Sequence, residues 1–174
     1  FQTTQVMQNQ GQYCRDASLE VLSAKFVPGK DEQPAEFAAM IKRKLQAANF
    51  PCDSAGRVMT ALSELVVNAL KHGCAGRPDG KVEAAVTIAE TYAQINVSDD
   101  GPGFDPEATL KKLRGRGVSF EPGSRGLLLA TGICSRLVFS DGGRQVEAVV
   151  MKDSGNVKAF AGKAPEGVRL IGKI

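Results

Sequence analysis

Two short stretches of the sequence carry polar side chains whose types and spacing suit phosphate and nucleotide chemistry. In the first, Glu64 and Asn68 lie four residues apart in a segment with helical periodicity. Their side chains therefore project from one side of a helix, about 40° apart around its axis. An Asn amide oxygen is a good ligand for Mg²⁺, and a carboxylate one turn earlier can act as a general base. Taken alone, the pair is more typical of a solvated helix face.

The second stretch begins at Asp99, where a predicted strand runs into a glycine-rich turn. Ile95, Val97 and Asp99 share one strand face by the two-residue period, so the carboxylate continues an apolar face. A buried carboxylate is costly unless it accepts hydrogen bonds, and the amino group of a purine would supply one. Gly101 and Gly103 remove side chains where a flat ligand would approach the backbone. An Asp-Gly pair alone is more typical of an ordinary turn, but the full Asp-x-Gly-x-Gly-Phe pattern about 35 residues after the Glu64–Asn68 helix favours a ligand site.

Hydrophobic periodicity predicts the elements that must position these residues. Alternation with period two predicts strands, and a 3.6-residue period predicts helices. The predicted strands are 18–27, 82–88, 93–99 and 146–150, and the predicted helices are about 34–48, 55–72 and 127–137. Asp53 or Ser54 is expected to cap the second helix, and Gly73 is expected to end it as a C′ glycine. The basic, glycine-punctuated segment 105–125 is expected to form a long loop.

Composition fits one compact domain and disfavours several classes of function. The chain has 174 residues, 43% of them hydrophobic, and a net charge of +3, which is too small to argue for nucleic-acid binding. It contains no apolar run long enough to span a membrane and no visible secretory signal. With one histidine and four scattered cysteines (Cys14, Cys52, Cys74, Cys134), zinc binding is poorly supported and a cytoplasmic protein with unpaired thiols is expected.

Domain organisation follows from the same periodicity. Residues 18–152 are expected to form the folded domain. Residues 1–17, polar and rich in Gln, are expected to be a loose segment or linker, and 153–174 a C-terminal tail. Because the sequence begins at Phe1, a longer polypeptide stays open.

Taken together, the motifs resemble those of the GHKL ATPase superfamily. The segment Ala61–Gly73 resembles the N-box, Asp99–Phe104 the first glycine box and Ser124–Leu127 the second, in the family's order. The resemblance covers residues 18–152 and fits the short anti-sigma-factor serine/threonine kinases of bacterial partner switching. These kinases lack the long lids and extra domains of the gyrase, Hsp90 and MutL branches.

The resemblance implies a Bergerat fold. This is a two-layer α+β sandwich with a mixed, mostly antiparallel sheet, helices on one face and ATP held on the helical side. Carried over, Glu64 would be the catalytic base acting on a partner's serine, and Asn68 would hold Mg²⁺. Asp99 would bind the adenine amino group in a pocket shaped by its glycines. The glycines that shape this pocket would be Gly101 and Gly103. The remaining inherited binding residues, in the second glycine box, would be Arg125, Gly126 and Leu127, with the Gly126 backbone contacting phosphate.

The function implied is that of an ATP-binding serine protein kinase that acts as an anti-sigma factor. Its partners would be a sigma factor and a STAS-type anti-sigma-factor antagonist, which it phosphorylates, and a homodimer is expected. Two alternatives stay open. Ser124 stands where the family usually has a glycine, which favours a binding module that sequesters a partner without efficient transfer. The chain could also be the ATPase domain of a larger phosphatase or histidine-kinase fusion, although His72, within the N-box helix, cannot serve as its phosphoacceptor.

Overall fold

The computed structural model describes residues 20–30, 32–74, 77–115, 124–153 and 169–170. The helices and strands in these ranges are, in chain order, β1 (Glu20–Phe26), α1 (Glu32–Ala47), α2 (Cys52–Asn68), β2 (Val82–Ile88), β3 (Tyr92–Asp99), α3 (Pro106–Gly115), α4 (Ser124–Ile133), β4 (Arg136–Ser140), β5 (Gln145–Met151) and β6 (Arg169–Leu170). A π-helical turn, Ala69–Gly73, continues α2, and a 3₁₀ turn, Asp141–Gly143, joins β4 to β5.

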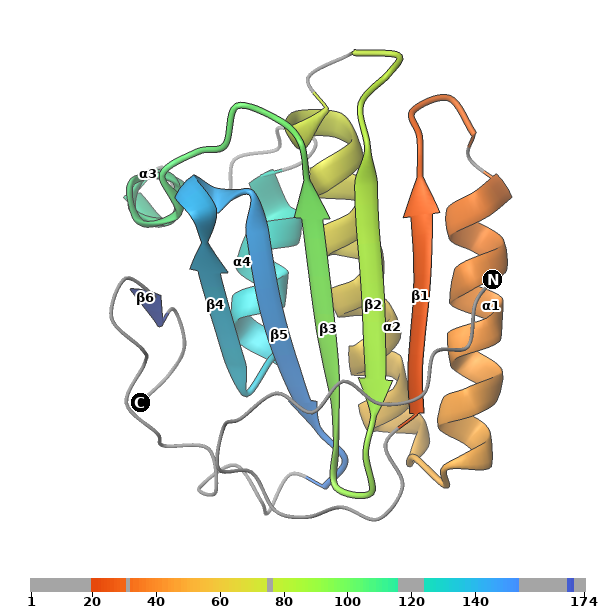
Figure 1. Ribbon diagram of the computed structural model, residues 1–174. Helices are drawn as coiled ribbons and strands as arrows, with labels where there is room; N and C mark the ends of the chain where they lie inside the picture. The colour runs from red at the N-terminus through yellow and green to blue at the C-terminus, as the bar shows by residue number, and fades with distance from the viewer. Residues whose placement is uncertain (1–19, 31, 75–76, 116–123, 154–168, 171–174) are drawn as a thin grey trace.

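The strands form one sheet of six, in the order β1-β2-β3-β5-β4-β6, and the helices lie on one of its faces (Figure 1). Every pairing among the described strands is antiparallel. The expected two-layer α+β sandwich of the Bergerat type is therefore confirmed. The described part of the sheet is antiparallel throughout, whereas a mixed, mostly antiparallel sheet was expected.

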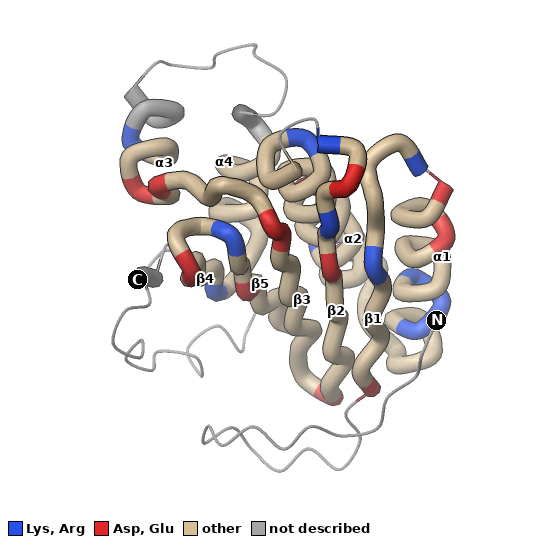
Figure 2. The backbone as a smooth tube through the Cα atoms, turned by 45° about the horizontal axis from the view of Figure 1, so that its top comes forward, with Lys and Arg blue, Asp and Glu red and all other residues tan. Residues whose placement is uncertain are grey.

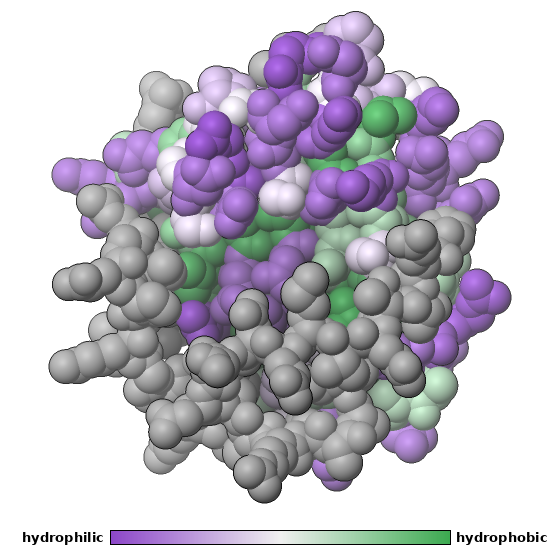
Figure 3. Space-filling model, in the orientation of Figure 1, coloured by the Kyte–Doolittle hydropathy of each residue, from purple (hydrophilic) through white to green (hydrophobic). Residues whose placement is uncertain are grey.

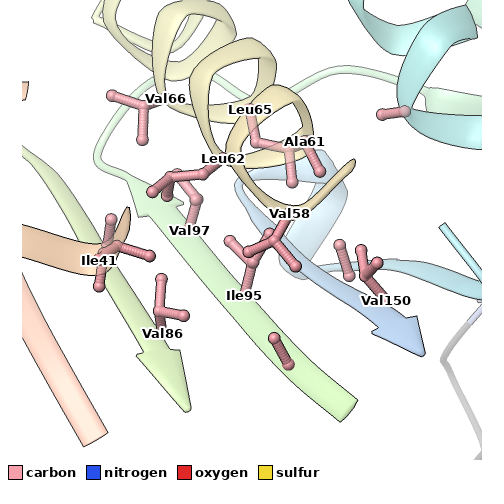
Figure 4. Close-up of a cluster of buried hydrophobic side chains, with 14 of the residues drawn as sticks. Ile41, Val58, Ala61, Leu62, Leu65, Val66, Val86, Ile95, Val97 and Val150 are labelled. Carbon is pink, nitrogen blue, oxygen red and sulfur yellow. The ribbon is translucent and has the colours of Figure 1, made fainter. Parts of the chain in front are cut away.

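The core lies between the sheet and α2. The apolar stripe of this helix is buried against the inward faces of β2, β3 and β5, as Figure 4 shows. Ile95 sits at the centre of the sheet, opposite Val86 on β2 and Ala148 on β5, and is fully buried. Because the stripe of α2 fixes the rotation of the helix, the residues off the stripe, Glu64 and Asn68, are only partly buried.

The start and end of α2 differ from the sequence-based expectation. The residue that precedes the helix is Pro51, and neither Asp53 nor Ser54 caps it. The Ser54 hydroxyl instead donates to the Pro51 carbonyl across 3.1 Å, inside the first turn. At the other end Gly73 belongs to the π-helical turn, in which the Cys74 N–H donates to the Ala69 carbonyl across 2.9 Å. The expected left-handed C′ conformation of Gly73 was therefore wrong.

Two further elements differ from expectation in the second half of the chain. Residues 106–115, expected to belong to a long loop, form α3. Its start is stabilised because the Asp105 carboxylate accepts the N–H groups of Glu107 and Ala108, each across 3.0 Å. The remainder of that predicted loop, 116–123, lies outside the described residues. The last predicted helix, 127–137, also differs, because α4 ends at Ile133.

The four final residues of that predicted helix, 134–137, do not continue it. Leu137, the apolar residue that suggested a longer helix, lies in β4 opposite Ala148. Its side chain is buried in the core from the strand and not from a helix.

The opposite face of the sheet carries no helix among the described elements (Figure 1). Its side chains include a polar cluster in which Gln94 donates to Glu147 across 3.1 Å and Arg136 pairs with Glu147 at 3.5 Å. Figure 3 shows this face, where hydrophilic side chains surround patches of hydrophobic ones. Among the helices of the described ranges, none combines the length and apolarity that crossing a bilayer demands.

Candidate functional site

The predicted site residues gather where α2 and β3 end, at the same end of the sheet (Figure 1). Glu64 and Asn68 occupy the last two turns of α2, and Asp99 is the last residue of β3. The turn Ala69–Gly73 packs against the end of β3. Acidic and basic residues also collect here, where the chain enters β2 and leaves β3 (Figure 2).

The Asp99 carboxylate is held in place and partly withdrawn from water. Its Oδ1 accepts the N–H of Gly101 across 2.9 Å, and the Asp99 N–H donates to the Arg144 carbonyl across 3.0 Å. Burial raises the pKa of Asp99 above its ordinary value, while the Gly101 hydrogen bond opposes that rise. No hydrogen-bond donor among the described residues reaches Oδ2, so only one of the two carboxylate oxygens is hydrogen-bonded there.

Two glycines press directly on this carboxylate and on each other. A Cβ added to Gly73 would lie 2.3 Å from the Asp99 Cγ, and one added to Gly101 would lie 1.8 Å from the Gly73 carbonyl oxygen. Real Cβ atoms do not approach other atoms this closely, so any larger residue would push the turn and the strand end apart. The sequence pattern singled out Gly101 for the approach of a ligand, which stays a prediction, and the structure shows that this glycine also lies against the Gly73 carbonyl. The helical run ends at Gly73 as expected, but the sequence did not indicate that Gly73 packs against Asp99.

Gly103 lies against the turn between β4 and β5. Its φ is +75°, and an added Cβ would lie 2.3 Å from the Gly142 carbonyl oxygen. The next residue, Phe104, donates its N–H to that same oxygen across 2.8 Å and packs edge-on against Phe139, with ring centroids 5.6 Å apart. The glycine therefore lets the turn that follows Asp99 pack closely against the turn between β4 and β5.

The second predicted cluster joins Glu64 to the start of α4. A Cβ on Gly126 would lie 2.1 Å from the Glu64 Oε2 and 3.0 Å from its Cδ. The carboxylate thus lies against the glycine near the N-terminal end of α4, where backbone N–H groups and the helix dipole favour negative charge. The Leu127 side chain is buried in the core, so only its backbone can face a ligand. The Arg125 side chain lies outside the described part of the structure.

Asn68 is the one predicted metal ligand. Its side chain is partly buried in the last turn of α2, one turn beyond Glu64. Within the described residues, no group of three or more His, Cys, Asp or Glu side chains is arranged to hold a metal ion. This chain's contribution to a metal site here would therefore be one or two oxygens, which is the usual protein share for Mg²⁺ bound with phosphates.

An ion pair between Arg77 and Asp100 also holds the turn that follows β3, and the motifs did not indicate Arg77. The Arg77 Nη2 donates to the Asp100 Oδ1 across 2.6 Å and to the Asp100 carbonyl across 2.9 Å. No sequence signal pointed to Arg77, because it lies 23 positions from Asp100 and the two residues meet only when the chain is folded. The hollow on the helix-free face, lined by residues such as Lys25, Asn96 and Glu147, is not lined by any of the predicted site residues.

Comparison with known proteins agrees with this arrangement. The model of the histidine kinase-like ATPase domain matches residues 27–150, well over half of the chain and all of the predicted site. The serine-protein kinases RsbW of Listeria monocytogenes and Listeria innocua are each 26% identical to it over 87 residues, which is 50% of this chain and 55% of theirs. The chain spans about half the length of these curated relatives. It belongs to the histidine kinase-like ATPase domain family.

Proposed function

We propose that this domain binds ATP with Mg²⁺ and is a serine protein kinase that acts as an anti-sigma factor. The observation that carries the proposal is the glycine-cradled carboxylate of Asp99 at the end of β3, beside the helix that bears Glu64 and Asn68. Membership of the ATPase family and the similarity to serine-protein kinases support it. The proposed catalytic domain is residues 18–152, with 1–17 and 153–174 as flanking segments.

The adenine end of the proposed site fits the residues present. Asp99 has one oxygen occupied by Gly101 and one without a donor from the described residues, as a purine amino group requires. The carboxylate is already partly desolvated, so its raised pKa reflects a cost that a bound hydrogen-bond donor would offset. A Cβ on Gly73 or Gly101 would intrude on this carboxylate, so the small side chains keep the cradle in place.

The phosphate end fits a magnesium nucleotide. Asn68 would contribute an amide oxygen to Mg²⁺, and the N-terminal end of α4, around Gly126, would offer backbone N–H groups to phosphate oxygens. ATP supplies the phosphoryl group for transfer, and Mg²⁺ neutralises the charge of its phosphates. Arg125 and Leu127 are proposed to contribute at the same end, Leu127 through its backbone.

Glu64 is proposed as the catalytic base. Its carboxylate would accept the proton of a substrate serine hydroxyl, and its contact with Gly126 holds it near the end of α4. Positioning supplies most of the catalysis in phosphoryl transfer, so a base fixed against a helix terminus suits the reaction. The proposed substrate is a STAS-type antagonist protein, the proposed binding partner is a sigma factor, and the proposed form is a cytoplasmic homodimer.

Calorimetric titration with ADP, with and without Mg²⁺, tests the nucleotide site. We expect magnesium-dependent binding with a dissociation constant on the order of micromolar, about −8 kcal/mol. Transfer from radiolabelled ATP to a purified STAS-domain protein then tests the kinase assignment. Absence of binding at millimolar ADP would contradict the proposal.

The second candidate function is a module that sequesters its partner without efficient transfer. The observation that favours it is Ser124, the first residue of α4, which stands where the family's second glycine box usually has a glycine. Replacing it, as Ser124→Gly, separates the candidates. If Ser124 weakens the nucleotide site, Ser124→Gly should raise the affinity for ADP. If the kinase site is intact with Ser124, the affinity should change little.

A further inference from the structure

The Arg77 guanidinium contacts two residues, Asp100 and Cys74. It donates to both the carboxylate and the carbonyl of Asp100, at 2.6 Å and 2.9 Å, and its Nε also reaches the Cys74 carbonyl at 3.4 Å. The arginine therefore ties the turn that follows α2 to the turn that follows β3. Both groups are partly exposed, with 44% and 43% of their side-chain surface accessible, so this contact is not part of the core.

Asp100 is also held by two hydrogen bonds with the backbone of Lys81. The Asp100 Oδ1 also accepts the Lys81 N–H across 3.0 Å, and the Asp100 N–H donates to the Lys81 carbonyl across 3.3 Å. The Lys81 N–H, helped by the charge of Arg77, holds the pKa of Asp100 below its ordinary value, so this side chain is ionised at neutral pH. Asp100 is thus fixed on its side chain and on both backbone groups.

Asp100 lies between the two groups that define the proposed adenine site. Asp99 precedes it, and Gly101, whose N–H binds the Asp99 Oδ1, follows it. With Asp100 fixed, the Gly101 N–H stays in place to donate to the Asp99 Oδ1 and so holds the carboxylate in one orientation. Gly73, which comes directly before Cys74 in the Arg77-bearing turn, closes the other side of the same carboxylate.

We propose that Arg77 is a positioning residue for nucleotide recognition, acting through Asp100 to hold the orientation of the Asp99 carboxylate. This inference rests on the proposed nucleotide site. Its guanidinium bonds are made to Asp100 and Cys74, so Arg77 acts on the adenine end and does not bind phosphate itself. Arginine is suited to this position because one planar group meets two acceptors, which a lysine ammonium on a flexible stem cannot reproduce.

The test compares adenosine with ADP as ligands of the full chain. Arg77→Ala should weaken both by a similar factor, about tenfold, because the adenine contact they share is disturbed. Arg77→Lys should lose nearly as much, since the charge remains but the two-acceptor geometry does not. Loss confined to ADP, or full recovery with lysine, would overturn the proposal by making Arg77 a simple phosphate-attracting charge.

Arg57 supplies the matched control. It also binds a carboxylate, that of Asp53 at 3.3 Å, and a backbone carbonyl, that of Met151 at 3.4 Å, but it does so near the start of α2. Arg57→Ala should leave both affinities unchanged. If it weakens adenosine and ADP as much as Arg77→Ala does, the effect is one of general stability and the proposal is wrong.

Amide hydrogen exchange at Gly101 gives a measurement that needs no ligand. In the nucleotide-free chain, Arg77→Ala should speed exchange of the Gly101 N–H at least tenfold, and Arg57→Ala should not. Unchanged exchange would overturn the positioning role. If the parent chain binds neither adenosine nor ADP, the proposed nucleotide site fails, while this exchange measurement still decides whether Arg77 holds the turn.

Discussion

At the scale of single residues, the site depends on Gly73 and Gly101, because neither position has room for a Cβ. Gly73→Ala would place a Cβ 2.3 Å from the Asp99 Cγ, so the turn and the strand end must separate. We expect loss of measurable ADP binding and a cost of about 1–3 kcal/mol in the free energy of unfolding. Gly56→Ala, at an exposed position of α2 with open space around it, is the control and should stabilise the helix by about 0.5–1 kcal/mol. Calorimetry and urea unfolding measure both effects.

Asp99 illustrates a residue whose function costs stability. Burial raises the pKa of its carboxyl, so its ionisation in the folded chain lowers stability as the pH rises through that raised value, and the loss persists at neutral pH. Asp99→Asn should therefore unfold at the same or a higher temperature at pH 7 while binding ADP at least tenfold more weakly. Asp53→Asn, exposed at the start of α2, should leave binding unchanged.

The same ionisation gives binding a pH dependence. Because the charged carboxylate would accept the purine amino group at the proposed site, the affinity of the parent chain for adenosine should fall as the pH drops through the raised pKa of Asp99. Asp99→Asn should show a flat profile over that range. A parent profile as flat as that of the variant would remove Asp99 from the adenine site.

At the scale of elements, a substitution at the contact between α2 and α4 should affect phosphoryl transfer and not nucleotide binding. Gly126→Ala would drive a Cβ to 2.1 Å from the Glu64 Oε2 and displace that carboxylate. We expect phosphoryl transfer to fall at least tenfold while adenosine affinity stays within twofold, because the adenine end lies on β3. Gly132→Ala, in the same helix with open space around it, should change neither. Equal loss in both variants would mean that helix stability, not Glu64, is the cause.

The elements also show where periodicity succeeds and where it fails. The stripe of α2 and the alternation of β2 and β3 were predictable, because each packs one face on the core and repeats the period that packing requires. The boundary between α4 and β4 was not, since apolar residues such as Leu137 fit either period over so short a run. The start of α3 did carry a signal, Asp105 followed by proline, but the basic, glycine-rich composition of 105–125 outweighed it.

The candidate site was partly predictable for a related physical reason. Glu64, Asn68 and Asp99 could be identified because their types and spacing are local. The position of Gly73 against Asp99, and of Arg77 against Asp100, joins residues more than 20 positions apart, and such contacts leave no periodic trace in the chain. Residue roles assigned from motifs alone therefore omit what holds the motifs together.

At the scale of the whole molecule, packing sets the order in which thiols react. Cys52 is exposed just after Pro51, whereas Cys74 is fully buried and burial raises the pKa of Cys134 to about 12. In the native chain at pH 8, iodoacetamide should modify Cys52 and leave Cys74 and Cys134 largely unmodified until urea unfolds the domain, as mapped by mass spectrometry. Rapid modification of Cys134 in the native chain would contradict the packing around it.

The π-helical turn after Asn68 has a consequence for how the chain can vary in length. Its ring, closed from Cys74 to Ala69, holds one residue more than an α-helical turn, and that residue brings Gly73 onto Gly101. Deleting one residue here would restore a regular helix but swing everything beyond it by roughly 100°. Insertions and deletions should therefore not be tolerated between Asn68 and Gly73, because this single turn sets the position of the proposed magnesium ligand relative to the proposed adenine pocket.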